Sequence, residues 1–168
     1  SETLFKDLKK QKLSNGEKLP TLEKYLKQGK KSKQVKLIVE IKPAKTPELE
    51  DEMVTKTLKI IRDKNLENQC EFISFSLHLC KEIKKQNPKA IVQYLAGDLS
   101  PSDIKNAGID GLDYHYSVFL DKHPGWISEA KKLGLITNVW TVNDEVIFKK
   151  LADLGVGFVT TNVPDVLK

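Results

Sequence analysis

From residue 35 to residue 161 the chain alternates short apolar segments with amphipathic ones, and this alternation restricts its possible folds more than any other feature. The apolar segments have the length and composition of buried strands and lie at residues 35–41, 71–76, 90–95, 111–116, 135–141 and 156–161. Segments typical of helices follow them near residues 46–61, 77–87, 101–107, 124–133 and 143–154, with a short terminal piece after Pro164. Strands that alternate with helices pair in parallel through right-handed crossovers. The sequence therefore predicts an α/β fold in a single domain over residues 1–168.

The junctions between these segments carry the residues that helix ends require. The segments NAGIDG, KLGLIT and DLGVGF each place a glycine between a helix end and an apolar strand, where a left-handed C-cap favours glycine. Thr46-Pro47, Ser100-Pro101 and Asn143-Asp144-Glu145 supply N-caps, with proline or acidic residues in the first turn. The boundary signals and the apolar pattern thus indicate the same division into elements.

The number of strand–helix units leaves two arrangements open. Six units are present after residue 34, whereas a closed (β/α)8 barrel requires eight. Residues 1–34 contain an expected helix at 2–10, a turn at Asn15-Gly16 and a second helix that begins near Thr21, but no convincing strand. Either the sheet is open and doubly wound, or the chain is a barrel that lacks two units. Counting alone favours the open sheet.

Composition excludes some classes of function. The formal net charge is +5, from 28 basic and 23 acidic residues, and Arg62 is the only arginine. Nucleic-acid binding is not expected, because such proteins usually rely on arginine for bidentate contacts, and the lysines are spread over helix faces as on a solvated surface. No run of about 18 apolar residues exists, so no transmembrane segment is predicted. Cys70 and Cys80 lack metal-ligand spacing and are expected to be small buried hydrophobes.

Three residues at strand ends are candidates for a functional site. Glu40 and Lys42 lie two positions apart at the end of the first strand, so they share a face beside the break at Pro43. A carboxylate there can bind a hard cation, and an ammonium can neutralise a phosphate; the alternative is a Glu/Lys pair on a half-exposed strand. Trp140, near the end of the fifth strand, is either a core residue or an apolar wall of a pocket.

The histidines do not form an obvious acid–base pair. His78 is expected at the start of a helix and His123 in a loop, whereas His115 lies on a strand near a plausible pocket mouth, with a structural role as the simpler interpretation. No glycine-rich phosphate loop, nucleophile elbow or HExxH motif is present.

Five short segments, taken in order, resemble the glycerophosphodiester phosphodiesterase family. LPTLEKYL (19–26) is similar to the family's Pro-Thr-Leu-Glu helix start, LIVEIKP (37–43) to its Glu-x-Lys strand, and ISFS (73–76) to its Ser-Phe strand. NVWTVND (138–144) and LGVGFVTTNVP (154–164) resemble the terminal part of its pattern. The resemblance covers residues from about 5 to 165.

This resemblance implies a (β/α)8 barrel, in which the six strands are the third to the eighth. It implies hydrolysis of a small glycerophosphodiester to glycerol 3-phosphate and an alcohol with a divalent metal ion, Ca²⁺ or Mg²⁺. Glu40 would be a metal ligand, Lys42 would contact the phosphate, and Trp140 would line the pocket over the glycerol group. No catalytic acid or base is identified on this chain.

The sequence departs from the family pattern in its catalytic motifs. The family's His-Arg-Gly, Glu-x-Asp and His-Asp motifs are absent, and Asn162 stands where the family usually has Asp. The hypothesis is that this chain is the C-terminal two-thirds of such an enzyme. Its first two βα units would then lie upstream or on another chain, and the chain by itself would be inactive. The alternative is a non-catalytic remnant that binds a phosphorylated small ligand through Lys42 and Trp140.

Overall fold

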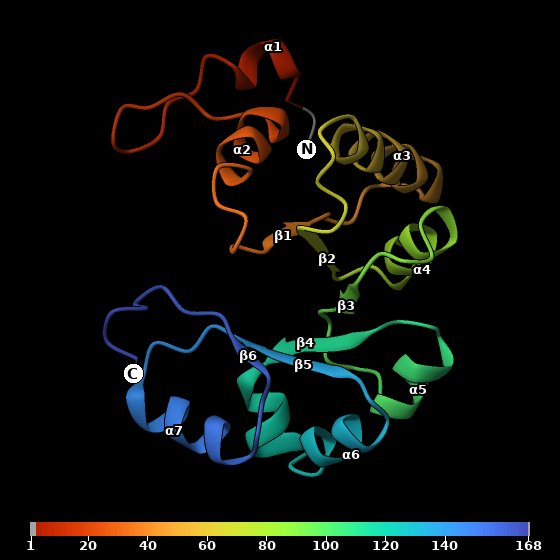
Figure 1. The fold of residues 1–168 in the computed structure, drawn as a ribbon, viewed down its shortest axis with the longest axis vertical. Helices are drawn as coiled ribbons and strands as arrows, with labels where there is room; N and C mark the ends of the chain where they lie inside the picture. The colour runs from red at the N-terminus through yellow and green to blue at the C-terminus, as the bar shows by residue number, and fades with distance from the viewer. Residues whose placement is uncertain (1–2, 168) are drawn as a thin grey trace.

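The central element is a curled, fully parallel sheet of six strands (Figure 1). The structure, a computed structural model, describes residues 3–167. The strands are β1 (Leu37–Glu40), β2 (Cys70–Ser74), β3 (Val92–Tyr94), β4 (Gly111–His115), β5 (Ile136–Trp140) and β6 (Phe158–Val159). Each pairs in parallel with the next in chain order. The predicted strands are therefore confirmed, although each is shorter than the apolar segment from which it was predicted.

Helices cover the convex side of this sheet. They are α3 (Pro47–Asp63), α4 (Leu77–Gln86), α5 (Pro101–Asn106), α6 (Trp126–Lys132) and α7 (Glu145–Asp153), and they form an outer arc around the strands (Figure 1). A doubly wound sheet would carry helices on both faces and reverse its strand order. A sequential strand order with helices on one side is the geometry of a barrel. The open, doubly wound sheet that the strand count favoured is therefore wrong, and the barrel arrangement is confirmed for these six strands.

The barrel is open among the described residues. Pairing stops at β1 on one side and at β6 on the other, and both edges expose apolar side chains. Ile38 on β1 is 46% exposed and Phe158 on β6 is 60% exposed. Apolar side chains along an unpaired strand edge are normally covered in a stable protein.

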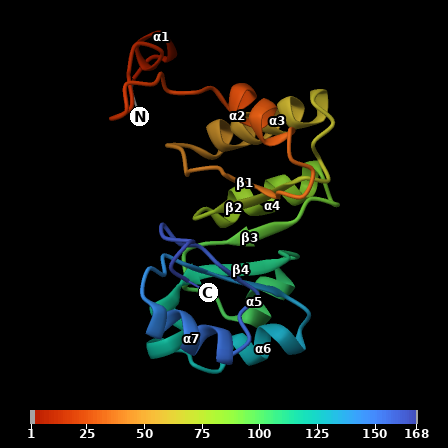
Figure 2. The same ribbon diagram turned by 60° about the vertical axis from the view of Figure 1, so that its left-hand side comes forward.

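The segment before β1 forms two helices. Helix α1 (Phe5–Leu8) and helix α2 (Leu22–Gly29) are confirmed, as is the turn at Asn15-Gly16, where Gly16 has a φ of +84°. The expected helix at 2–10 is shorter in the structure, and residue 2 lies outside the described residues. Thr21 caps α2 by accepting a hydrogen bond from the Lys24 amide. The part before α2 stands away from the body of the molecule (Figure 2).

Two local expectations differ from the structure. The piece after Pro164 is a turn over the described residues, because the Val166 amide bonds to the Val163 carbonyl and no further helical bond follows. A π-helical turn, η1 (Val118–Lys122), occupies the loop after β4, closed by the His123 amide on the Val118 carbonyl. Sequence periodicity gives no signal for such a single turn.

Helix caps and the core follow the predicted pattern. Thr46, Ser100 and Asp144 accept hydrogen bonds from amides in the first turns of α3, α5 and α7. Cys70 and Cys80 are free and buried, and burial raises the pKa of the Cys70 thiol to about 11 and that of Cys80 to about 12. No helix among the described residues has the length and apolarity needed to span a bilayer.

Gly111 is a position where the packing between β4 and β5 leaves no room for a side chain. A Cβ there would lie 2.5 Å from the Ile136 carbonyl oxygen and 2.8 Å from the Ile136 Cβ. Because backbone cannot move aside cheaply, Gly111→Ala is expected to lower the free energy of unfolding by about 1–3 kcal/mol. The midpoint of thermal unfolding, followed by circular dichroism, measures this. Gly125→Ala is the control, since a Cβ at Gly125 meets nothing within 4 Å; equal midpoints for the two variants would contradict the packing argument.

Candidate active site

A cavity of about 260 Å³ opens at the carboxyl ends of the strands. We call it the strand-end cavity. Each of the six strands contributes to it, either with a side chain of its own or with the first residues that follow it. Its lining residues are Glu40, Lys42, Ile73, Phe75, Leu95, Asp113, Trp140, Thr141 and Thr160. In (β/α)8 barrels this end of the strands carries the active site, and all three sequence-predicted residues lie here.

Glu40 and Lys42 face the same side of the chain, as their spacing predicts. The Lys42 ammonium lies 2.7 Å from Glu40 Oε1, and the side chains are 75% and 32% exposed. At this exposure the pair contributes little to stability. Glu40 occupies one of the three donors of the Lys42 ammonium, which leaves two donors for another acceptor.

Buried polar contacts fix the backbone on either side of Lys42. The Glu50 carboxylate is 6% exposed; its Oε1 accepts from the Ala44 amide at 3.1 Å and its Oε2 from the Ser76 hydroxyl at 2.8 Å. The buried Ser74 hydroxyl donates to the Ile41 carbonyl at 2.6 Å. These bonds tie the loop after β1 to the loop after β2, so the backbone at the base of Lys42 is held while its side chain is exposed.

Trp140 forms an aromatic wall of the cavity. Its indole N–H donates to the Asp113 carbonyl at 2.9 Å, which fixes the plane of the ring. The Phe75 ring packs edge-on against it with centroids 5.7 Å apart, and the His115 ring does so at 5.2 Å. Of the two interpretations left open by the sequence, the geometry favours a pocket wall, because Trp140 lines the cavity and is not fully buried.

The described histidines do not combine into an acid–base pair. His78 Nε2 lies 2.7 Å from Asp51, and the His123 ring stacks on Trp126 at 3.8 Å. His115 Nδ1 lies 2.8 Å from the Ser117 hydroxyl and 3.3 Å from the Ser117 amide nitrogen. None of these rings lines the strand-end cavity.

Asp113 is a charged residue of the cavity that the sequence did not identify as part of a site. Its side chain is 2% exposed, and its Oδ1 has no hydrogen-bond partner. Burial, and secondarily the negative charge of Glu40, raises the pKa of the Asp113 carboxyl to about 7. Asp113 has the same parity as His115 in the strand GLDYHY, which places the two on one face of the strand but does not say which face lines the cavity.

The carboxylates present do not make a complete site for a divalent cation. Among residues 3–167 no group of three or more His, Cys, Asp or Glu side chains is arranged to hold a metal ion. Glu40 and Asp113 supply two carboxylates to the cavity, and Lys42 already occupies one Glu40 oxygen. Ca²⁺ and Mg²⁺ require six or more oxygens, so the described residues hold at most part of such a site.

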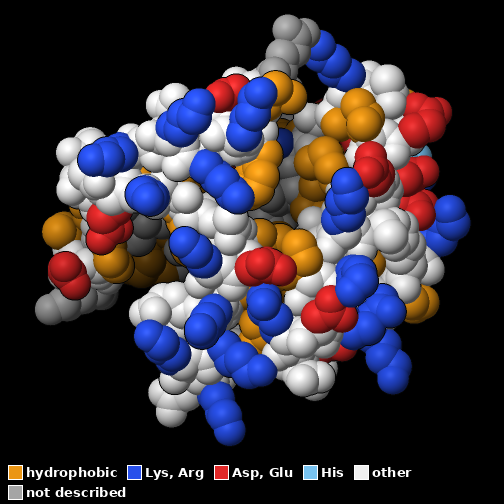
Figure 3. Space-filling model, turned by 90° about the horizontal axis from the view of Figure 1, so that it is seen from above, with side chains coloured by type: hydrophobic (Ala, Val, Ile, Leu, Met, Phe, Trp, Pro, Cys, Tyr) orange, Lys and Arg blue, Asp and Glu red, His pale blue; other side chains and the backbone are white. Residues whose placement is uncertain are grey.

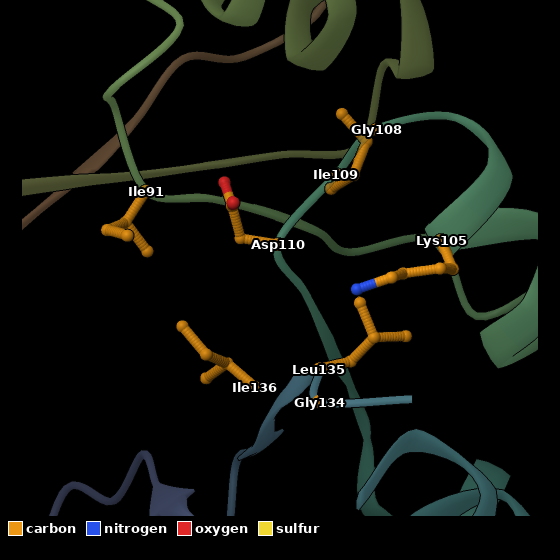
Figure 4. A pocket seen from close by; sticks show the side chains of 8 residues that line it. All are labelled: Ile91, Lys105, Gly108, Ile109, Asp110, Gly134, Leu135 and Ile136. Carbon is orange, nitrogen blue, oxygen red and sulfur yellow. The ribbon is translucent and has the colours of Figure 1, made fainter. Parts of the chain in front are cut away.

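A second hollow lies at the opposite, amino-terminal end of β3, β4 and β5 (Figure 4). Its one carboxylate, that of Asp110, accepts bonds from the Lys84 ammonium at 2.9 Å and from the Val92 amide at 2.9 Å. Figure 4 shows the Lys105 side chain reaching into this hollow above Leu135. The Asp110 carboxylate thus joins α4 to β3, and residues at this end of a barrel usually serve stability.

Comparison with known proteins identifies the family. The model of the glycerophosphoryl diester phosphodiesterase family matches residues 3–166. The chain belongs to this family. It is similar to the solved structure of a glycerophosphodiester phosphodiesterase from Parabacteroides distasonis, with a TM-score of 0.94 and 43% identity over 97% of this chain and 68% of that one. No protein among the curated sequences matches significantly.

Two further solved structures resemble this phosphodiesterase-family chain. One, from Silicibacter pomeroyi and provisionally named a glycerophosphoryl diester phosphodiesterase, has a TM-score of 0.78 and 27% identity over 87% of this chain and 54% of that one. The other is a phosphodiesterase from Oleispira antarctica in complex with the product sn-glycerol 3-phosphate, with a TM-score of 0.73 and 23% identity over 88% and 59% of the two chains. At that identity the likeness of the second supports the fold. The chain therefore spans between about half and two-thirds of these structures.

Proposed function

We propose that this chain supplies the phosphate- and glycerol-binding part of an enzyme that hydrolyses glycerophosphodiesters to glycerol 3-phosphate and an alcohol. The observation that carries this proposal is the meeting of Glu40, Lys42 and Trp140 in one cavity at the carboxyl ends of the strands. Membership of the phosphodiesterase family supports the same reaction class.

Each of these residues has a chemical task in the proposed reaction. The Lys42 ammonium, swung from Glu40 toward the cavity, binds a phosphate oxygen and stabilises the negative charge that gathers there as water attacks phosphorus. Trp140, backed by Phe75, packs against the carbon chain of the glycerol group. Glu40 offers one oxygen to a divalent cation, which when bound would polarise the phosphate.

The reaction also needs a base to take the proton of the attacking water and an acid to protonate the departing alkoxide as the phosphorus–oxygen bond breaks. Lys42 cannot perform both tasks near neutral pH, and no histidine among the described residues lines the cavity. We therefore propose that both groups, and the remaining metal ligands, belong to two βα units outside this chain. These units would also cover the exposed edges at Ile38 and Phe158.

Two experiments test this proposal. The coding sequence upstream is expected to encode a strand ending in His-Arg, then a Glu-x-Asp and a His-Asp motif. The complete protein, defined as this chain with those units, is expected to release glycerol 3-phosphate from glycerophosphoethanolamine and to lose at least about 100-fold in rate with EDTA, restored by Ca²⁺ or Mg²⁺. An upstream stop codon would contradict units encoded on the same chain, and a complete protein without turnover would contradict hydrolysis.

A second candidate is a non-catalytic remnant that binds a phosphorylated small ligand. The lack of an acid–base pair in the cavity among the described residues favours it. It predicts that glycerol 3-phosphate binds while no glycerophosphodiester is hydrolysed with any added metal.

The absence of nucleic-acid binding stays a prediction. On the face seen in Figure 3, basic side chains lie scattered among acidic ones.

A further inference from the structure

Asp113 carries a buried polar atom that no contact within the described residues explains. Three buried side-chain oxygens there lack a hydrogen-bond partner: Gln93 Oε1, Asp113 Oδ1 and Asn138 Oδ1. Gln93 and Asn138 line a neighbouring hollow deeper in the curled sheet, beside Ile38 and Phe158. Of these three residues, Asp113 is the one that lines the strand-end cavity. A buried carboxyl oxygen without a partner is destabilising, so its retention at a cavity wall points to a ligand.

The surroundings of Asp113 restrict what that ligand group can be. A phosphate is disfavoured beside Asp113, because the carboxyl groups of Asp113 and Glu40 would repel an anion at this wall, whereas Lys42, the one cation among the lining residues, can neutralise a phosphate on its own side of the cavity. A hard cation is disfavoured because Ile73, Leu95 and the Trp140 ring supply no oxygen ligands. A hydroxyl group fits, since it can donate to a carboxylate oxygen and is attached to carbon that packs on apolar walls.

Trp140 lies next to Asp113 and provides such a wall. Its indole N–H donates to the main-chain carbonyl of Asp113 at 2.9 Å, and the two residues belong to paired strands, β4 and β5, whose register is continuous from Gly111 to His115. The hydrogen bond fixes the aromatic ring relative to the Asp113 backbone, and both side chains line the same cavity. A polar acceptor beside an aromatic face is the usual environment for a polyol, whose carbon face is apolar and whose edge is polar.

We propose that Asp113 recognises a hydroxyl of the glycerol group and thereby sets the preference for glycerol-containing phosphodiesters over diesters of simple alcohols. The inference rests on the proposed function for the phosphate end of the substrate, which Lys42 holds. The phosphate and the glycerol chain then bind at different walls of one cavity, so the contributions of Lys42 and Asp113 are separable.

The test compares two ligands of the complete protein, sn-glycerol 3-phosphate and n-propyl phosphate, which has the same carbon chain without hydroxyls. Isothermal titration calorimetry in EDTA measures both affinities. The unmodified protein is expected to prefer glycerol 3-phosphate by at least about tenfold, because a site built to bond a hydroxyl rejects an analogue that lacks it. Asp113→Ala is expected to abolish that preference and to leave the affinity for propyl phosphate within about twofold.

Two further variants make the outcome decisive. Asp113→Leu removes both oxygens while filling the space, so it gives the same test if the alanine variant fails to fold. Lys42→Ala is expected to weaken both ligands equally. If it weakens neither, the proposed phosphate site fails, whereas the Asp113 comparison still stands. The inference is overturned if the Asp113 variants still prefer glycerol 3-phosphate over propyl phosphate, or if they lower the affinity for both ligands equally. It is also overturned if their effect appears only when Ca²⁺ replaces EDTA, because Asp113 would then be a metal ligand.

Discussion

Replacing Lys42 by alanine is expected to lower kcat/KM of the complete protein for glycerophosphoethanolamine by on the order of 10²–10³-fold. Lys42 lines the strand-end cavity and its side chain is 75% exposed, so its loss removes a positive charge from the proposed phosphate site without disturbing the core. Glu40→Gln is expected to have an effect of similar size, because it removes the one strand-end carboxylate assigned to the metal. A coupled assay for glycerol 3-phosphate measures both variants.

The matched control for this prediction is Lys149→Ala. Lys149 forms an ion pair of the same length, 2.7 Å, with Glu145 on the outer helix α7, and its side chain is 64% exposed. Loss of an exposed pair changes stability by less than about 1 kcal/mol, and this one lies away from the cavity. Activity is expected to be unchanged in Lys149→Ala; undiminished activity in Lys42→Ala or Glu40→Gln would disprove the site assignment.

Replacing Asp113 by asparagine is expected to stabilise the protein, and to do so in a pH-dependent manner. Burial raises the pKa of Asp113 from 3.8 to about 7, so between these pH values the folded protein holds a proton that the unfolded chain has lost. The free energy of unfolding therefore falls as the pH rises from about 4 to about 7. Each step of one in pKa corresponds to roughly 1.4 kcal/mol, which gives a penalty on the order of 4 kcal/mol at pH 8.

Asp113→Asn removes this penalty, so its gain in stability is expected to be largest above pH 7 and close to zero below pH 4. Thermal unfolding in EDTA at pH 4, 6 and 8 measures it. Asp110→Asn, just before the same strand, is the control. Its carboxylate is engaged by Lys84 and the Val92 amide, so its replacement is expected to destabilise the protein. Asp113→Asn that is destabilising at pH 8, or equally stabilising at pH 4 and pH 8, would contradict the predicted burial of a charged group.

A stabilising substitution at a cavity wall has a functional meaning. Natural proteins keep unfavourable groups mainly where activity requires them. The unfolding experiment measures the stability that the Asp113 carboxyl costs, and the ligand comparison measures the binding preference that it provides. Both effects should arise from the same buried carboxyl.

The limits of the sequence-based prediction are visible in particular residues. Glycines at the helix ends were predicted correctly, and Gly108, Gly134 and Gly155 have φ values of +73°, +68° and +79°. Strand lengths were overestimated, most of all for β6, which spans Phe158–Val159 alone. The segments read as strands extend past the observed strands into residues that line the cavity, such as Leu95 and Thr160, whose amides still bond to the Ser74 and Val139 carbonyls.

Asp113 shows why the site was only partly predictable. Parity places it on one face of β4, but it does not say whether that face is the concave interior or the helix-covered exterior. Both faces of a parallel strand are apolar in sequence, so the pattern around Asp113 is equally compatible with either. Glu40 and Lys42 were found because they stand at a strand end marked by Pro43, which is a local signal.

The sequence by itself determined the order of strands and helices, their capping residues and the membership of Glu40, Lys42 and Trp140 in one end of the sheet. These features follow from local patterns: the capping residues, the alternation of apolar segments and the place of each side chain at the end of its own strand. Only the tertiary structure decided that the sheet curls with its helices on one side, that its edges at β1 and β6 stay open, and that Asp113 faces the cavity. Those features depend on how the strands twist and pack against one another, which brings together side chains that are far apart in the sequence.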